Sequence, residues 1–331
     1  MTARKMALGV LALTLAGACS QGADEAPDQT AELAQPIMGG VPAVDARYAA
    51  VGALATQFYV DWIPDVPPFY AYDFICSATL VDSQAVVTAR HCTETLAQYQ
   101  QDLGDQPVFL TGDFTWDPEQ VIPITGWVAA PPSDRHPGLL LDGGRDVAVA
   151  YLAGAPEGIE PARVGHFNQQ MVGKQFELAG YGWNDYYLEE WGFDTGEKMV
   201  GVGTARALEG QWYSLLFDDD YDAYLDWFMV DADTSNPTEE QAQGWWNAFW
   251  LEPGYELLTG GLEGEALSCY GDSGGPLLSI EKDKLTVYGV SFATEPSQAN
   301  LCDHGSAYLV FNEEMHAFVN RALSSGQPPL R

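Results

Sequence analysis

The sequence predicts an all-β fold, either a barrel or a sandwich, because its apolar residues lie in short runs separated by turn signals. From Ile37 onward, apolar and β-branched runs alternate with Gly, Pro and Asp, and long helical patterns are few. The length of 331 residues and a hydrophobic fraction of 47% are enough for a sizeable core. The expected strands are "AVVTA", "VFLTG", "VAVAYL", "FELAGYG", "LTVYGVSFA" and "SAYLVF".

Two segments have helical signals instead. "NEEMHAFVNRAL" is periodic near the C-terminus, with Asn312 as its cap and acidic residues in its first turn. "SNPTEEQAQGWWNAFW" predicts a helix with Asn236 as cap, Pro237 in the first position and Glu239 reaching back.

The N-terminus predicts export. Arg4 and Lys5 precede an apolar run that is too short to span a bilayer, so residues 1–18 are expected to be a signal peptide. The small residues before Cys19 are typical of a lipoprotein cleavage site, although Ala16 stands where Leu is usual. An ordinary secretory signal that contains a cysteine is the alternative. Residues 19–36 are polar and small, as in a flexible tether.

Export places the cysteines in an oxidising compartment, where disulfides persist. The chain has five: Cys19, Cys76, Cys92, Cys269 and Cys302. An odd number needs an explanation, and lipidation of Cys19 supplies one by leaving four for two disulfides. The sequence leaves three pairings of those four open.

The chain is strongly acidic, with 14 basic and 47 acidic residues and a net charge of −33. Nucleic acid is excluded as a partner because binding to phosphates needs a basic surface. A solvated surface accounts for most of this acidity. A salt-adapted habitat and a bound calcium ion are the alternatives.

The segment Gly271–Pro276, "GDSGGP", is the most informative motif. A serine between glycines predicts a hydroxyl at a tight turn, where backbone N–H groups can converge on an oxyanion. The segment also fits G-x-S-x-G, the nucleophile elbow of α/β-hydrolases. That fold needs an acid and then a histidine after the serine, and the short remainder of the chain leaves no room for its βα units.

The opposite order, His then Asp then Ser, is present. "VVTARHC" places His91 just after an expected strand and beside Cys92, and "GGRDVAVAYL" places Asp146 at the start of another strand. Each motif alone is common by chance, whereas three in this order, with cysteines beside two of them, are not.

With these motifs the chain resembles the chymotrypsin/trypsin family of serine endopeptidases over nearly all of residues 37–331. "IMGG" is similar to the family's mature N-terminus, "TARHC" and "RDVAV" to its histidine and aspartate motifs, "LAGYGW" to the strand before the autolysis loop, and "CYGDSGGP" to its serine motif. The resemblance implies two packed antiparallel Greek-key β-barrels with a C-terminal helix and the active site in the cleft between the barrels. It implies a bacterial, exported endopeptidase that acts on peptides or proteins without a cofactor or metal.

The resemblance also implies the residue roles. Ser273 would be the nucleophile, His91 its general base, and Asp146 the group that orients the imidazole. The N–H groups of Gly271 and Ser273 would form the oxyanion hole. Ser291 would lie on the strand that pairs with the substrate backbone. The implied disulfides are Cys76–Cys92 and Cys269–Cys302, which again leaves Cys19 alone.

The specificity pocket departs from the family pattern. Leu267 stands at the floor position, where an acid would favour Arg or Lys. Phe292 and Ala293 replace a common Trp-Gly pair, and Ser306 aligns where a Gly is frequent. We expect a shortened apolar pocket for small or medium apolar side chains, with Asp303 as a candidate acid near the rim.

The span between the aspartate and serine motifs is longer than usual, and the surplus falls in residues 183–256. This segment has seven of the ten tryptophans and seventeen acidic residues, but only two basic ones. It is expected to be an insertion that packs on the barrel and buries its own aromatics. The alternatives are a lid or exosite that selects substrates, and a calcium site, although the spacing of its aspartates fits no EF-hand loop. These aspartates are Asp218, Asp219, Asp220 and Asp222.

In this family a new N-terminus folds inward and its ammonium pairs with the acid before the nucleophile. The matching residues are Ile37 and Asp272, so the chain is expected to be a zymogen that is cleaved before Ile37. Pro36 precedes the cut and no basic residue does, so neither a trypsin-like activator nor trypsin-like self-processing is expected. An activating protease of another kind is a candidate partner. Cleavage would release the protease from a Cys19 lipid anchor, its only expected link to a membrane. The expected location is therefore the cell envelope (periplasm or cell surface) for the anchored lipoprotein, secretion from the cell, or both.

A non-catalytic binding protein that kept the protease fold is the alternative function. Such proteins usually lose a triad residue, and none is lost here.

Overall fold

The computed structural model describes residues 37–64, 66–132, 145–182, 196–230, 237–281, 284–296 and 302–326. The expected signal peptide and tether, with Cys19, lie outside these residues. The side chain of Asp303, the candidate acid near the pocket rim, and the expected helix cap Asn236 also lie outside them. No helix in the described part of the chain combines the length and apolar character needed to cross a membrane.

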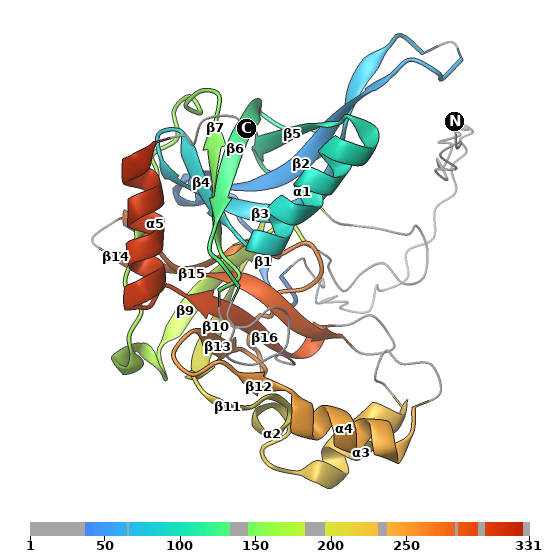
Figure 1. Ribbon diagram of the computed structural model, residues 1–331, viewed down its shortest axis with the longest axis vertical. Helices are drawn as coiled ribbons and strands as arrows, with labels where there is room; N and C mark the ends of the chain where they lie inside the picture. The colour runs from blue at the N-terminus through green and yellow to red at the C-terminus, as the bar shows by residue number, and fades with distance from the viewer. Residues whose placement is uncertain are drawn as a thin grey trace, which may run out of the picture. The chain divides into compact units, whose positions relative to one another are not determined.

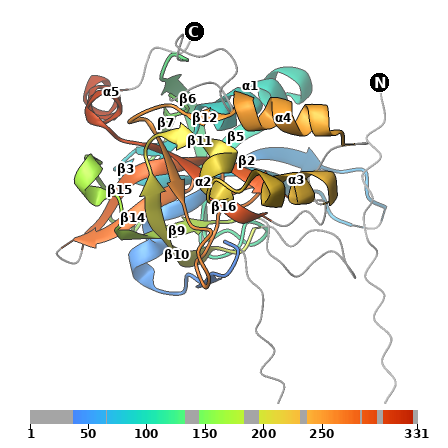
Figure 2. The same ribbon diagram turned by 90° about the horizontal axis from the view of Figure 1, so that it is seen from below.

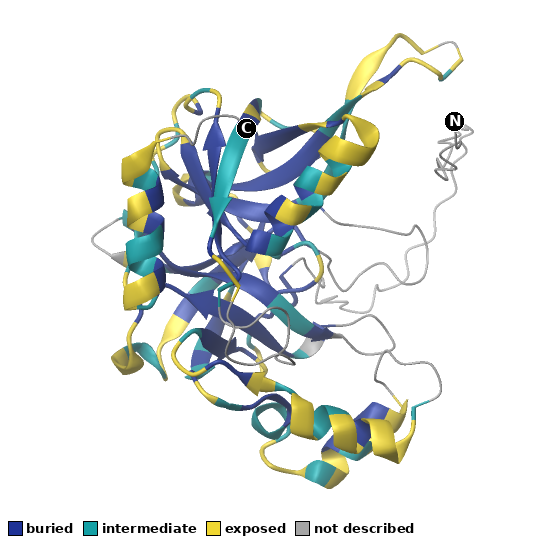
Figure 3. Cartoon of the chain, viewed as in Figure 1, coloured by how far each residue is buried: buried dark blue, intermediate teal, exposed yellow. Residues whose placement is uncertain are grey.

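Six antiparallel strands close into a first barrel, in the order β2-β3-β4-β7-β6-β5 (Figure 1). They are β2 (Val51–Val60), β3 (Phe69–Asp82), β4 (Ala85–Thr88), β5 (Gln106–Thr111), β6 (Gln120–Ala129) and β7 (Ala148–Leu152). Every residue of β4 and β7 is buried, because these strands are short and composed of apolar or small residues throughout. Figure 3 shows this interior in dark blue.

A second set of six strands also forms a ring, because β9 pairs with both β10 and β14. Its members are β9 (Gln175–Gly180), β10 (Met199–Ala207), β13 (Glu256–Thr259), β16 (Cys302–Val310), β15 (Lys284–Pro296) and β14 (Pro276–Glu281). The short strand β1 (Val41–Pro42) pairs with β10, and β8 (Arg163–Val164) runs parallel to β15. The expected fold of two antiparallel barrels is confirmed, and each expected strand lies in one of them.

The C-terminal helix is confirmed as α5 (Glu313–Ser325), where the side chain of Asn312 accepts a hydrogen bond from the N–H of Met315. The second expected helix, α4 (Glu239–Ala248), begins later than its signals indicated. Thr238 is its N-cap, and Gln241 reaches back to complete a capping box. Assigning the cap and the returning side chain to Asn236 and Glu239 was therefore wrong, because a threonine hydroxyl nearer the helix serves as the acceptor.

Helix α1 (Arg90–Leu103) was not expected. It begins directly after β4 and buries Cys92 and Leu96, which are one helical turn apart. Gly104, with φ 75°, ends it in the left-handed conformation that favours glycine. The structure also has two short 3₁₀ helices, η1 (Ala46–Ala50) directly before β2 and η2 (Gln169–Met171) before β9.

The acidic, Trp-rich span 183–256 is not one continuous insertion, because strand β10 lies within it. Its helices follow β10 and form what we call the helical insertion, residues 210–251. This unit contains α4 together with β11 (Gly210–Gln211), α2 (Trp212–Leu216), α3 (Tyr221–Val230) and β12 (Trp250–Leu251). Strands β11 and β12 pair and close its base. Its three helices lie next to one another in both views (Figures 1 and 2).

The helical insertion buries a cluster of its own aromatic residues, as expected, although Trp250 is exposed. Trp212, Tyr213, Tyr224 and Phe228 are almost completely inaccessible. Their rings are close, with 4.6 Å between the centroids of Tyr213 and Tyr224 and 5.7 Å between those of Tyr224 and Phe228. The acidic residues of α3 and α4, which are Asp222, Asp226, Glu239 and Glu240, are all exposed. Exposed residues of these helices are yellow in Figure 3.

Candidate active site

The predicted catalytic residues meet at one cavity of about 310 Å³. His91 and Asp146 reach it from the first barrel, and Gly271 and Ser273 from the second. The other lining residues are Cys269, Tyr270, Ser291, Phe292, Ala293 and Thr294. Residues that are far apart in the sequence thus converge where elements of the two barrels meet.

The pairing of β4 with β7 brings His91 and Asp146 together. Thr88 lies opposite Ala148 in this antiparallel pair, so the residues after β4 and those before β7 emerge at the same end of the barrel. His91 follows on the first turn of α1, and Asp146 comes two residues before β7.

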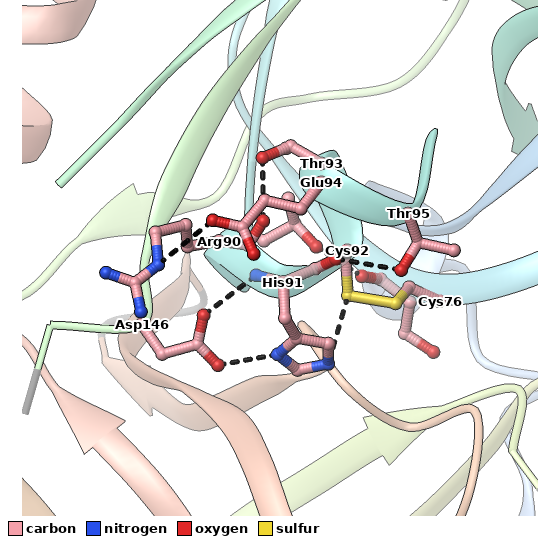
Figure 4. A network of polar contacts seen from close by, with 10 residues as sticks. Cys76, Arg90, His91, Cys92, Thr93, Glu94, Thr95 and Asp146 are labelled. Carbon is pink, nitrogen blue, oxygen red and sulfur yellow. Dashed lines mark hydrogen bonds and ion pairs between the residues drawn. A yellow bond between two sulfur atoms is a disulfide. The ribbon is translucent and has the colours of Figure 1, made fainter. Parts of the chain in front are cut away.

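The geometry of this pair is that of an oriented imidazole (Figure 4). His91 Nδ1 lies 2.6 Å from Asp146 Oδ2, and the backbone N–H of His91 donates to Asp146 Oδ1 at 2.9 Å. The Asp146 side chain is buried, whereas that of His91 is 35% exposed. Because Nδ1 is directed at the carboxylate, Nε2 is left for a group in the cavity.

A disulfide between Cys76 and Cys92 joins β3 to the start of α1, as the resemblance implied. Cys92 Sγ lies 3.7 Å from His91 Nε2 (Figure 4), so the sulfur bounds one side of the imidazole. These three side chains are close enough together to suggest a metal site. Both sulfurs are in the disulfide, however, and a disulfide provides no thiolate ligands.

Ser273 sits in a tight turn held by its own backbone and by the first barrel. The N–H of Gly275 donates to the carbonyl of Asp272 at 2.7 Å, and the Ser273 carbonyl accepts from the N–H of Ser77 at 2.8 Å. Gly274 has φ 78°, and a Cβ there would lie 2.1 Å from Thr88 Oγ1, so no larger residue fits.

The backbone N–H groups of Gly271 and Ser273 are the predicted oxyanion hole. Among the described residues, no backbone carbonyl accepts a hydrogen bond from the N–H of Gly271 or Ser273. Gly271 has φ 91°, and a Cβ there would lie 2.8 Å from the ring of Phe74. Both residues line the cavity, where these N–H groups can bind a developing negative charge.

Ser77 is a supporting residue that the sequence did not reveal. Its hydroxyl accepts from the N–H of Tyr181 at 3.1 Å and donates to the carbonyl of Gly271 at 3.2 Å. Together with its backbone bond to Ser273, these contacts fix the serine turn from the first barrel. Only the tertiary structure shows this role, since Ser77 is an ordinary polar residue inside strand β3.

The five expected specificity residues divide into two groups. Ser291, Phe292 and Ala293 line the cavity, whereas Leu267 and Ser306 are buried and do not line it. Leu267 instead packs in a cluster with Met38, Cys269 and Cys302. The second disulfide, Cys269–Cys302, lies in the same cluster and is also the pair that the resemblance implied.

Ser306 is hydrogen-bonded to Ser268, the residue before the lining residue Cys269. Its hydroxyl accepts from the N–H of Ser268 at 2.8 Å and donates to the Ser268 carbonyl at 3.2 Å. The hydroxyls of Ser268 and Ser291 are 3.0 Å apart and hydrogen-bonded. This buried serine network is joined to the cavity through Ser291, whereas Leu267 is not among the residues that line the cavity.

Asp272 is fully buried beside the nucleophile. One carboxylate oxygen accepts from the N–H of Gly182 and the other from that of Cys269, each at 2.8 Å. Burial raises the pKa of Asp272 to about 7, although the two backbone hydrogen bonds act in the opposite direction. Ile37 is also fully buried, but in the intact chain its nitrogen is part of a peptide bond and cannot supply an ammonium.

No protein-family model and no curated protein sequence matches the chain. Solved structures do match. One is neuropsin, a serine protease expressed in the limbic system of mouse brain, with a TM-score of 0.51 and 16% identity over 86% of this chain and 98% of neuropsin. Another is HL collagenase, with a TM-score of 0.51 and 15% identity over 87% of this chain and 98% of that one. These similarities establish the chymotrypsin-like two-barrel fold.

Proposed function

We propose that the chain is a serine endopeptidase in which His91, Asp146 and Ser273 form the catalytic triad. One observation carries the proposal: the cavity that Ser273 lines also contains an imidazole whose Nδ1 lies 2.6 Å from a buried carboxylate. A histidine held in this way, next to a serine at a glycine-rich turn, is the arrangement that activates a hydroxyl.

In the proposed mechanism, Ser273 Oγ attacks the carbonyl carbon of the scissile peptide bond while His91 Nε2 takes its proton. Asp146 stabilises the resulting imidazolium, and the amides of Gly271 and Ser273 stabilise the oxyanion. His91 then gives the proton to the leaving amine, and an acyl group remains on Ser273. Water repeats the two steps, with His91 again as base and then as acid, and releases the carboxylic acid product.

A fluorophosphonate probe tests this proposal, because it reacts only with an activated serine. We expect stoichiometric labelling of the chain that begins at Ile37, and no labelling of its Ser273→Ala variant. Absence of labelling in the correctly processed chain would contradict the enzyme and favour a binding protein that kept the fold.

We propose that the substrate residue before the scissile bond has a small or medium apolar side chain, because Phe292 and Ala293 line the cavity and Leu267 stands where an acid would favour Arg or Lys. Ser306 contacts Ser268, which is hydrogen-bonded to the lining residue Ser291, and replacing Ser306 with glycine removes that side chain and its hydrogen bonds. We expect kcat/KM for a substrate with Phe before the cleavage site to rise about tenfold relative to one with Ala.

Peptide-library profiling measures this preference. Ser83→Gly is the matched control, since Ser83 is exposed in a turn of the first barrel and should leave the profile unchanged. Strong cleavage after Arg or Lys by the wild type would show that the pocket assignment is wrong.

We further propose that the chain is exported as a lipoprotein and activated by cleavage before Ile37. One feature of Ile37 and one of its neighbour Met38 support this cleavage site. Its φ of 49° is strained for a β-branched residue, and cleavage removes this torsion because a new N-terminus has no φ. The carbonyl of Met38 accepts a hydrogen bond from the N–H of Leu267 at 2.9 Å. Leu267 is five residues before Asp272, so the segment after the cleavage site is already bound to the segment that contains Asp272.

A further inference from the structure

The helical insertion contacts the strand that borders the proposed substrate site. Trp212 and Tyr213, the first residues of α2, both point at the carboxylate of Glu295. Trp212 Nε1 donates to Glu295 Oε2 at 2.9 Å, and the Tyr213 hydroxyl donates to Oε1 at 3.4 Å. Glu295 lies on β15 only two residues beyond Ala293, which lines the cavity.

A second contact holds the neighbouring strand. The ring of His304, on β16, packs against two aromatic rings of the helical insertion, 5.0 Å from the centroid of Phe217 and 5.2 Å from that of Trp227. Strands β15 and β16 pair with each other in this region. The insertion therefore contacts both of these strands, β15 through Glu295 and β16 through His304.

Strand β15 has an edge available for a peptide where these contacts begin. Its pairing with β14 ends at Val290, and among the described residues Ala293 and Thr294 pair only with β16. The opposite edge faces the cavity, which Phe292, Ala293 and Thr294 line. An extended substrate can add to such an edge as a further strand, provided that the edge keeps a fixed position.

The contacts to Glu295 are suited to hold it rigidly. Its side chain is only 6% exposed, and a buried carboxylate depends strongly on its hydrogen-bond donors. Burial and the nearby Glu295 carboxylate raise the pKa of Tyr213 well above its ordinary value, so its hydroxyl stays protonated and can donate. Loss of either donor would loosen the hold of the insertion on this part of β15, which its pairing with β16 alone would then position.

We propose that Trp212 and Tyr213 are positioning residues for substrate binding, which fix β15 through Glu295 so that it can hold the peptide upstream of the scissile bond. The inference rests on the proposed endopeptidase function. It assigns the helical insertion a role in affinity for extended polypeptide substrates, not in the bond-breaking steps.

The test compares Trp212→Phe with the matched control Trp250→Phe. Trp250 belongs to the same insertion, but it is 49% exposed and donates to the carbonyl of Asn247 instead of to β15. Each variant is assayed with a peptide that extends several residues upstream of the cleavage site and with an ester of the same single residue. We expect Trp212→Phe to raise KM for the peptide about tenfold, with kcat and the ester kinetics unchanged. Trp250→Phe should leave KM and kcat unchanged for both the peptide and the ester.

An unchanged KM, or an equal loss on peptide and ester, would overturn the inference. If Trp212→Phe does not fold, Tyr213→Phe provides the same readout, because it removes one hydroxyl and keeps the ring. A smaller rise in peptide KM would support the inference, and no rise would contradict it. The rate of labelling by the fluorophosphonate probe distinguishes failure of the proposed function from failure of this inference. A wild type that does not react refutes both. A wild type that reacts, with no rise in peptide KM in the variants, refutes only the inference.

Discussion

Replacing His91 with alanine is expected to lower kcat by about a million-fold, with little change in KM. The reason is that Ser273 is a poor nucleophile until a base takes its proton, and His91 is the base that the structure places in its cavity. Its Nδ1 is held 2.6 Å from Asp146, so the ring is already oriented before substrate binds. Steady-state kinetics with the chain that begins at Ile37 measure the loss.

His166→Ala is the matched control for this prediction. His166 is exposed and its ring lies 5.7 Å from that of His316, on helix α5, so neither histidine belongs to the cavity. The control should keep wild-type kcat. A similar kcat for His91→Ala and wild type would mean that His91 is not the base.

The second large effect concerns Asp272 in the intact chain. Its pKa is raised from 3.8 to about 7 by burial, so between these pH values the folded chain binds more protons at this site than the unfolded chain does. Asp272 therefore makes the free energy of unfolding fall as pH rises from about 4 to 7, and its contribution is constant above that. The expected loss is on the order of 4 kcal/mol.

Urea unfolding at several pH values tests this prediction. The intact chain should carry Ser273→Ala to prevent hydrolysis during the measurement. Many other carboxylates titrate in this acidic chain, so the quantity to compare is the difference between this protein and its Asp272→Asn counterpart. Identical pH profiles for the two would refute the raised pKa.

Cleavage before Ile37 should reverse the effect. The new ammonium would pair with the Asp272 carboxylate and lower its pKa, so the loss of stability toward neutral pH should disappear in the processed chain. If the intact and processed chains show the same Asp272-dependent profile, the ion pair between Ile37 and Asp272 does not form.

The strands and the C-terminal helix could be predicted because their signals are local. Strand β7, for example, is an uninterrupted apolar run, and Asn312 stands directly before its helix. Helix α1 gave a weaker signal, since its sequence is mostly polar and few of its residues are buried. The start of α4 was misjudged because two candidate caps, Asn236 and Thr238, lie two residues apart.

The candidate triad could be predicted because each residue lies in a short motif of its own. The pocket walls could not be predicted in the same way. Leu267 packs with Met38, Cys269 and Cys302 instead of lining the cavity, and Met38 and Cys302 are far from Leu267 in the sequence. The contacts of Trp212 and Tyr213 with Glu295 also join distant segments, so no local pattern indicates them.

The central claim is that Ser273 becomes acylated during peptide-bond hydrolysis. Trapping the intermediate tests this most directly: the chain that begins at Ile37 is mixed with a slowly turned-over ester, quenched in acid, and examined by mass spectrometry. The proposed mechanism predicts an added mass equal to the acyl group, located on the peptide that contains Ser273 and absent from Ser273→Ala. Turnover of the ester with no acyl adduct, or with the adduct on another residue, would contradict it.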